Sequence, residues 1–149
     1  MKLSQWSSAN QRAKLMFDYL PTEDRDPSLD LARCFFSDHG QDLADAAARL
    51  GGACGNARVV SCALQIKTAC RMNHRIRRDL VALHRLLSLE DVGDPACLET
   101  ELFGALHPAN PQVETICVLT DMLSNLLTQI DSSLASRAYS EGEGNSAAA

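Results

Sequence analysis

Apolar side chains between Asn56 and Ser88 recur every seven residues in two interleaved series. Together the two series are Val59, Cys62, Ile66, Ala69, Asn73, Ile76, Leu80, Leu83 and Leu87. This spacing is typical of a coiled-coil-like helix that packs one edge against another helix. It predicts one continuous long helix over 56–88, in which Asn73 is the single polar position of the packed edge.

A second seven-residue pattern begins after Pro111 and predicts another long helix over 111–137. Its inward positions are Val113, Ile116, Thr120, Leu123, Leu127, Ile130 and Leu134. Leu119 and Leu126 widen the apolar face. A face of that width is expected to pack against more than one neighbouring helix.

Three shorter helices are predicted at about 27–38, 41–50 and 95–106. Asp26-Pro27, Asp94-Pro95 and Asn110-Pro111 each place a capping side chain before a proline that suits a first helical turn. His39-Gly40 and Gly51-Gly52 are the expected stops of the first two.

Residues 27–137 are therefore expected to form one helical domain. In the N-terminal segment, 1–26, helical spacing of Trp6, Ala9, Ala13, Phe17 and Leu20 predicts a short helix at about 8–19, followed by an acidic loop. The tail over 138–149 has no apolar period, so we expect it to be disordered.

The expected fold is all-α, a helical bundle built on two long antiparallel amphipathic helices with several short helices packed on them. Alternatively, one of the two long helices pairs with its copy in a second chain, and both arrangements hold if two hairpins dimerise into a four-helix bundle. Asn73 bears on this choice, because a buried Asn can specify a dimer by pairing with its twin. Its alternative role is hydrogen bonding within one chain.

The cellular compartment follows from what the sequence lacks. It has neither an apolar signal peptide nor a run of about 20 apolar residues that could cross a membrane. We therefore expect a cytoplasmic protein that does not bind membranes. Its six cysteines are expected to be reduced, free and mostly buried.

The segment over 56–88 is strongly basic, with seven Lys and Arg residues against one Asp, although the whole chain has a net charge of -5. The exposed candidates for partner binding are Arg71, Arg75, Arg78 and Arg85. An acidic partner protein would suit them. The alternatives are a solvated face balanced by acidic segments, and a nucleic-acid-binding regulator that uses the same face. Nucleic acid is less favoured, because no aromatic side chain lies between Phe36 and Phe103 to stack on bases.

No residue pattern indicates catalysis, and no cofactor is expected. Cys70 and His74 are four residues apart and could face one metal ion on the predicted helix, but zinc would need two further ligands. The chain is therefore interpreted as a non-enzymatic interaction, regulatory or adaptor protein that acts through the surface of its long helices. A metal- or thiol-redox-responsive sensor is the remaining alternative.

Overall fold

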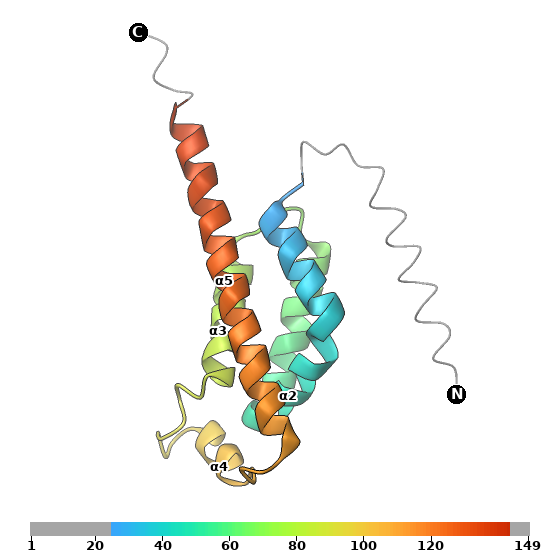
Figure 1. Ribbon diagram of the computed structural model, residues 1–149, viewed down its shortest axis with the longest axis vertical. Coiled ribbons are helices and arrows are strands. Elements are labelled where there is room, and N and C mark those ends of the chain that lie inside the picture. The colour runs from blue at the N-terminus through green and yellow to red at the C-terminus, as the bar shows by residue number, and fades with distance from the viewer. Residues whose placement is uncertain (1–24, 144–149) are drawn as a thin grey trace, which may run out of the picture.

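The computed structural model describes residues 25–143, and this part of the chain is helical without any strand, which confirms the all-α class (Figure 1). Its helices are α2 (Pro27–Thr68), α3 (His74–Leu87), α4 (Leu98–Gly104) and α5 (Pro111–Glu143). None of the helices within 25–143 has both the length and the apolar content needed to cross a membrane.

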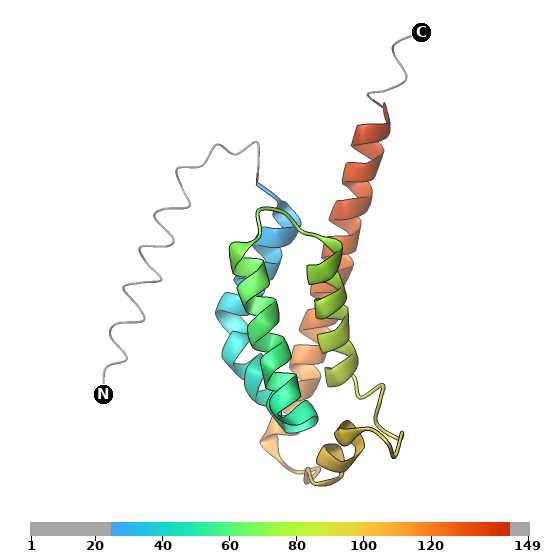
Figure 2. The same cartoon turned by 180° about the vertical axis from the view of Figure 1, so that it is seen from behind.

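Helix α2 folds back on itself at Gly52 and so forms two arms, a first arm over 27–51 and a second arm over 53–68. Gly52 has φ 59° and ψ -147°, a conformation that only glycine adopts readily. The two arms are in close contact beyond this turn, since a Cβ added to Gly55 would overlap the carbonyl oxygen of Ala47. Figures 1 and 2 show the arms side by side.

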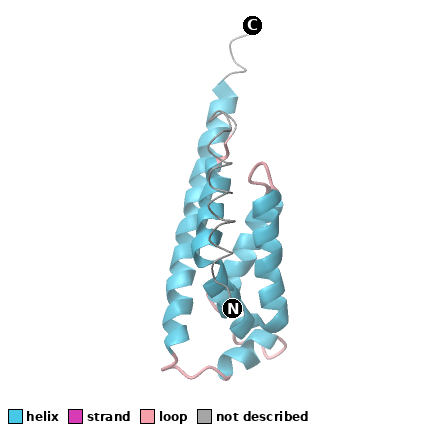
Figure 3. Ribbon diagram, turned by 90° about the vertical axis from the view of Figure 1, so that its right-hand side faces the viewer, coloured by secondary structure: helices cyan, strands magenta, loops and turns pink. Residues whose placement is uncertain are grey.

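The two arms of α2, α3 and α5 lie alongside one another and enclose one apolar core (Figure 2). Loops join these helices at the ends of the bundle, and α4 lies across the end that contains the Gly52 turn (Figure 3). The large side chains that are fully buried come from all four segments, namely Leu29, Leu43, Leu50, Ile66, Ile76, Leu80, Leu83, Leu87, Leu123 and Ile130. Most of them are inward positions of the two predicted seven-residue patterns.

The predicted single helix over 56–88 is wrong, because α2 ends at Thr68 and α3 begins only at His74. Residues 69–73 form a loop that reverses the chain (Figure 2). Asn73 is the exposed N-cap of α3, and its side-chain oxygen accepts a hydrogen bond from the Ile76 N–H at 2.9 Å. It therefore cannot specify a dimer from within a buried helical edge.

The other predicted helix boundaries are corrected as follows. Residues 27–38 and 41–50 belong to one continuous arm, since the helix passes through His39 and Gly40. Helix α4 is shorter than 95–106, because the Asp94 carboxylate accepts from the Ala96 N–H and forms a turn there. Helix α5 extends beyond 137, so residues 138–143 are helical rather than disordered. The predicted helix at 8–19 lies outside the described residues.

Candidate protein-interaction surface

Asp26 organises the end of the bundle where the loop over 69–73 lies. Its carboxylate is buried and accepts hydrogen bonds from the Ser28 N–H at 3.0 Å, the Met72 N–H at 2.8 Å and Arg137 Nη1 at 2.9 Å. Burial acts to raise the pKa of Asp26, but the bonds from Met72, Arg137 and Ser28 outweigh it and hold the pKa below 3.8. The start of α2, the loop and α5 are thereby fastened together.

Arg33 fixes the same loop from the first arm of α2. Its guanidinium donates to the carbonyl oxygen of Ile66 at 3.3 Å and to that of Ala69 at 2.7 Å. These carbonyls lie at the end of a helix, where intrahelical donors run out. From the sequence, Asp26 has only a capping role and neither Arg33 nor Arg137 stands out, because their partners are 33 to 111 residues away.

Basic side chains gather around this fixed loop. We call them the basic end and define it as Lys67, Arg71, His74, Arg75 and Arg78, all of which are exposed. Within residues 25–143 the side chains of Lys67 and Arg75 make no hydrogen bond or ion pair. Arg78 lies 3.6 Å from the Asp79 carboxylate, and the Arg78 side chain remains 66% exposed.

The first turn of α3 is unusual in its charge. It contains His74, Arg75 and Arg77 and no acidic residue. The amino end of a helix carries a partial positive charge, so each exposed cation there costs about 0.3–1 kcal/mol. The same combination of positive side chains and a positive helix end attracts an anionic group. Lys67 and Arg75 are thus the two cations of the basic end whose side-chain charge is not paired within the described residues.

Arg77 is a cation of this helix that does have a partner in the bundle. Its Nε and Nη2 atoms donate to the two carboxylate oxygens of Asp131 at 2.6 and 2.8 Å. The hydrogen bond and the opposite charge raise the pKa of Arg77 and lower that of Asp131. This pair joins α3 to α5 and leaves Arg77 outside the basic end.

Arg85, the fourth predicted partner-binding residue, is not brought together with the other three. It lies in the last turn of α3, whereas Arg71 precedes that helix and Arg75 lies in its first turn. Its guanidinium pairs with Glu90 at 3.0 Å and with Asp91 at 3.1 Å. The acidic segment after α3 thus balances Arg85 locally.

Cys70 and His74 do not share a helical face, because Cys70 lies in the loop and His74 is the first residue of α3. Both side chains are exposed. Among residues 25–143, no three His, Cys, Asp or Glu side chains are grouped closely enough to hold a metal ion. The geometry that motivated this weak candidate site is therefore not present.

The expectation of mostly buried cysteines is wrong, because most of them occupy outward positions of the helices. Cys34, Cys54, Cys70 and Cys117 are exposed, Cys97 is half-buried and only Cys62 is buried. Burial, with a smaller effect from Asp79, raises the pKa of the Cys62 thiol to about 12. The pKa of Cys97 is also raised, by burial and then by the neighbouring Asp94. Reactive thiols have lowered pKa values, whereas the pKa values of these two thiols are shifted in the opposite direction.

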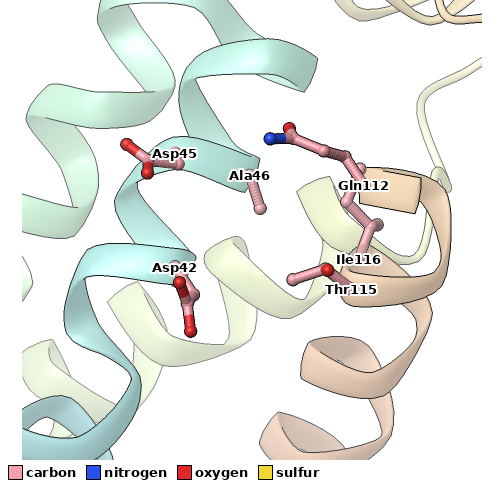
Figure 4. Close-up of a pocket in the computed structure, with 6 residues that line it drawn as sticks. All are labelled: Asp42, Asp45, Ala46, Gln112, Thr115 and Ile116. Atoms are coloured by element: carbon pink, nitrogen blue, oxygen red, sulfur yellow. The ribbon is translucent and has the colours of Figure 1, made fainter. Parts of the chain in front are cut away.

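A shallow hollow between the first arm of α2 and α5 is lined by Asp42, Asp45, Ala46, Gln112, Thr115 and Ile116 (Figure 4). The carboxylates of Asp42 and Asp45 do not point toward one another. The Asp45 carboxylate accepts from the Gln41 amide at 3.1 Å, and the Thr115 hydroxyl donates to the Pro111 carbonyl at 3.5 Å. Both of these contacts lie within single helices, and the two carboxylates do not converge on one point.

Comparison with known proteins gives no match: no protein-family model, no curated protein and no solved structure is similar to this chain. Its function has to be inferred from the geometry and charge of its own residues. The basic end is the feature that departs most clearly from what stability alone would favour.

Proposed function

We propose that this protein is a non-enzymatic, cytoplasmic interaction protein that binds an acidic segment of a partner protein at its basic end. The observation that carries the proposal is the placement of exposed cations at the amino end of α3 with no acid in its first turn. Natural sequences break such local rules mainly where function requires it. A regulatory or adaptor role fits a surface of this kind.

The chemistry of the partner follows from the charges that it must complement. Carboxylates would neutralise Lys67 and Arg75, which lack partners among the described residues, and would also meet the positive end of α3. The loop that joins their two helices is held in place by Asp26 and Arg33. A surface fixed before binding loses little conformational entropy when the partner arrives. Complementary charge of this kind chiefly sets specificity and the rate of association.

A nucleic acid is the second candidate for the same cations, since phosphates would satisfy them equally well. Residues 37–102, which include the whole basic end, contain no Phe, Tyr or Trp side chain that could stack on bases. The overall charge of -5 also repels a polyanion. We therefore favour an acidic protein segment, and the salt dependence of binding distinguishes the two.

The experiment reverses two charges of the basic end in an Arg71→Glu/Arg78→Glu double variant. Its matched control is Arg49→Glu/Arg58→Glu, which reverses two exposed cations outside the basic end. Immobilised wild-type protein, variant and control are used to capture proteins from nuclease-treated lysate, and the retained proteins are identified by mass spectrometry. We expect the wild type and the control to retain a common acidic protein that the variant loses, with no loss of thermal stability.

Equal retention of every captured protein by variant and control would show that the basic end is only a solvated surface. If the wild type retains proteins from untreated lysate but not from nuclease-treated lysate, nucleic acid is favoured as the ligand instead. In that case affinity for duplex DNA should fall steeply as salt is raised, because each phosphate contact releases counterions.

A further inference from the structure

A line of exposed apolar side chains runs along the second arm of α2. We call it the outer stripe and define it as Ala53, Ala57, Val60 and Leu64. Their spacing of four, three and four residues places them on one face of the helix. Val60 is 58% exposed and Leu64 61% exposed, although the opposite face of the same arm is buried in the core. The second arm thus has two apolar faces, and the bundle covers one of them.

The first arm has a row of small side chains that begins one turn after Arg33. Arg33 bonds to the end of the second arm, and residues spaced three or four positions after it continue the same line. These residues are Ser37, Gly40, Ala44 and Ala48. Apart from Arg33 itself, this row would present no bulky side chain to a helix packed on the outer stripe.

We propose that the outer stripe binds the N-terminal segment of the same chain, with residues 3–20 forming an amphipathic helix. The apolar residues of this segment recur at helical spacing and are Leu3, Trp6, Ala9, Ala13, Phe17 and Leu20. Residues 1–24 lie outside the described part of the structure. The argument for their position rests on where they join it and on what they would cover.

The junction lies close to one end of the outer stripe. Asp26 is bonded to Met72, which lies in the loop directly after α2, and Leu64 is one turn before the end of α2 at Thr68. Residues 21–24 can span about 13 Å when extended. On a helix the line from Trp6 to Phe17 would be about 16 Å long, and the outer stripe from Ala53 to Leu64 is also about 16 Å long. The reach and the lengths therefore agree.

The charges at the junction are complementary as well. Asp18, Glu23 and Asp24 lie at the end of the segment that would be nearest Lys67. The segment would run parallel to the second arm, with Phe17 over Leu64 and Ala13 over Val60. Trp6 would then lie near Ala53 and near Leu98, a half-exposed side chain of α4 whose Cδ2 is 3.6 Å from where a Cβ of Gly52 would be.

The size of the outer stripe favours a tethered segment over a second copy of the chain. A stable dimer buries about 800 Å² on each partner, whereas the stripe offers only Val60 and Leu64 as large exposed side chains. A segment joined through a short linker is already present at an effective concentration of about millimolar. At that effective concentration, a small apolar contact is sufficient to keep the segment bound.

The test uses the fluorescence of Trp6, which is the single tryptophan of the chain. In the full-length protein we expect a blue-shifted emission maximum and protection from acrylamide quenching. Leu64→Arg and, separately, Val60→Arg should shift the maximum to that of the protein in concentrated urea and remove the protection. Val118→Arg, at a 51% exposed apolar residue of α5, is the matched control and should leave both readings unchanged.

Circular dichroism of each variant checks that the bundle stays folded, which is expected because the substituted side chains are exposed. A wild-type maximum equal to that in urea would overturn the proposal, as would a blue-shifted maximum that neither arginine variant moves. If the maximum depends on protein concentration and sedimentation shows a dimer, the stripe binds a second copy and the proposal is also overturned.

Discussion

Arg137 Nη1 lies 2.9 Å from Asp26 Oδ2, and this contact joins residues 111 positions apart in the chain. The carboxylate is buried, whereas the arginine side chain is 41% exposed. Because the same carboxylate also accepts from Met72 and Ser28, one side chain holds three segments together. The stability of this end of the bundle should therefore be sensitive to Asp26.

Replacing Asp26 by alanine should lower the free energy of unfolding by about 3 kcal/mol, because it removes a helix cap and two charge-assisted hydrogen bonds. Urea denaturation followed by circular dichroism at 222 nm measures the change. Asp38→Ala, at an exposed carboxylate, should stay within about 0.5 kcal/mol of the wild type. Equal effects of the two substitutions would show that the Asp26 contacts add nothing.

The contribution of Asp26 should depend on pH in a defined direction. Its pKa is lowered in the folded state from an ordinary value of 3.8, so the ionised carboxylate favours folding. The stabilisation is fully present above the unfolded pKa and is lost as the pH falls through the folded pKa. The difference in unfolding free energy between wild type and Asp26→Asn should therefore shrink below about pH 4. Urea titrations at neutral and acidic pH test this, and a widening difference would contradict it.

Two glycines of α2 should respond to alanine with opposite signs. A Cβ at Gly55 would overlap the Ala47 carbonyl across the turn, so Gly55→Ala should destabilise the protein by at least about 2 kcal/mol. A Cβ at Gly40 meets nothing within 4 Å, so Gly40→Ala should stabilise the helix by about 0.5–1 kcal/mol. Thermal unfolding of both variants gives the comparison. Similar melting temperatures would argue against the close approach of the two arms.

Arg75→Glu should separate stability from binding. An acid in the first turn of α3 meets the positive end of the helix, so the variant should be more stable by about 0.3–1 kcal/mol. The same change should weaken capture of an acidic partner. Differential scanning calorimetry and the capture assay provide the two readings. A variant that is less stable than the wild type would show that Arg75 has a structural role.

The thiols should react in two classes. Ellman's reagent should label Cys34, Cys54, Cys70 and Cys117 quickly in the native protein, because these side chains are exposed. Cys62 should react only on unfolding, since its thiol is buried and its pKa is about 12. A Cys62→Ala variant identifies the slow phase. If Cys62 of the native wild-type protein also reacted quickly with the reagent, the core would have to open at this position.

The inward face of each helix can be predicted from the sequence, because burial follows the helical period within each segment. Ile66 and Leu80 are both buried as expected, although they belong to different helices. The break between them cannot be predicted, because Asn73 fits the seven-residue spacing equally well as a polar inward residue and as a helix cap. The choice depends on Asp26 and Arg33, which fix the loop from distant parts of the chain.

Gly40 and Gly52, the two glycines at which the sequence predicts a helix end, also show that local sequence alone cannot decide where a helix stops. The helix continues through Gly40, whereas Gly52 takes a positive φ and reverses the chain. Local sequence offers a stop at both, and the close packing of Gly55 on Ala47 exists only at the second. Likewise, the sequence predicts both Arg78 and Arg85 as exposed partner-binding residues of one long helix. Only the folded loop after α3 brings Glu90 and Asp91 to Arg85.

The reversals at Gly52 and at residues 69–73 also bear on how the chain reaches its native state. They make the second arm of α2 the sequence neighbour of both the first arm and α3, so these three segments can associate through short-range contacts. Proteins dominated by such local contacts have low contact order and fold rapidly. The Asp26–Arg137 bond instead requires closure of a loop of 111 residues, whose entropic cost is met only after α5 has docked. We therefore expect the Asp26–Arg137 bond to form late, after α2 has folded on itself.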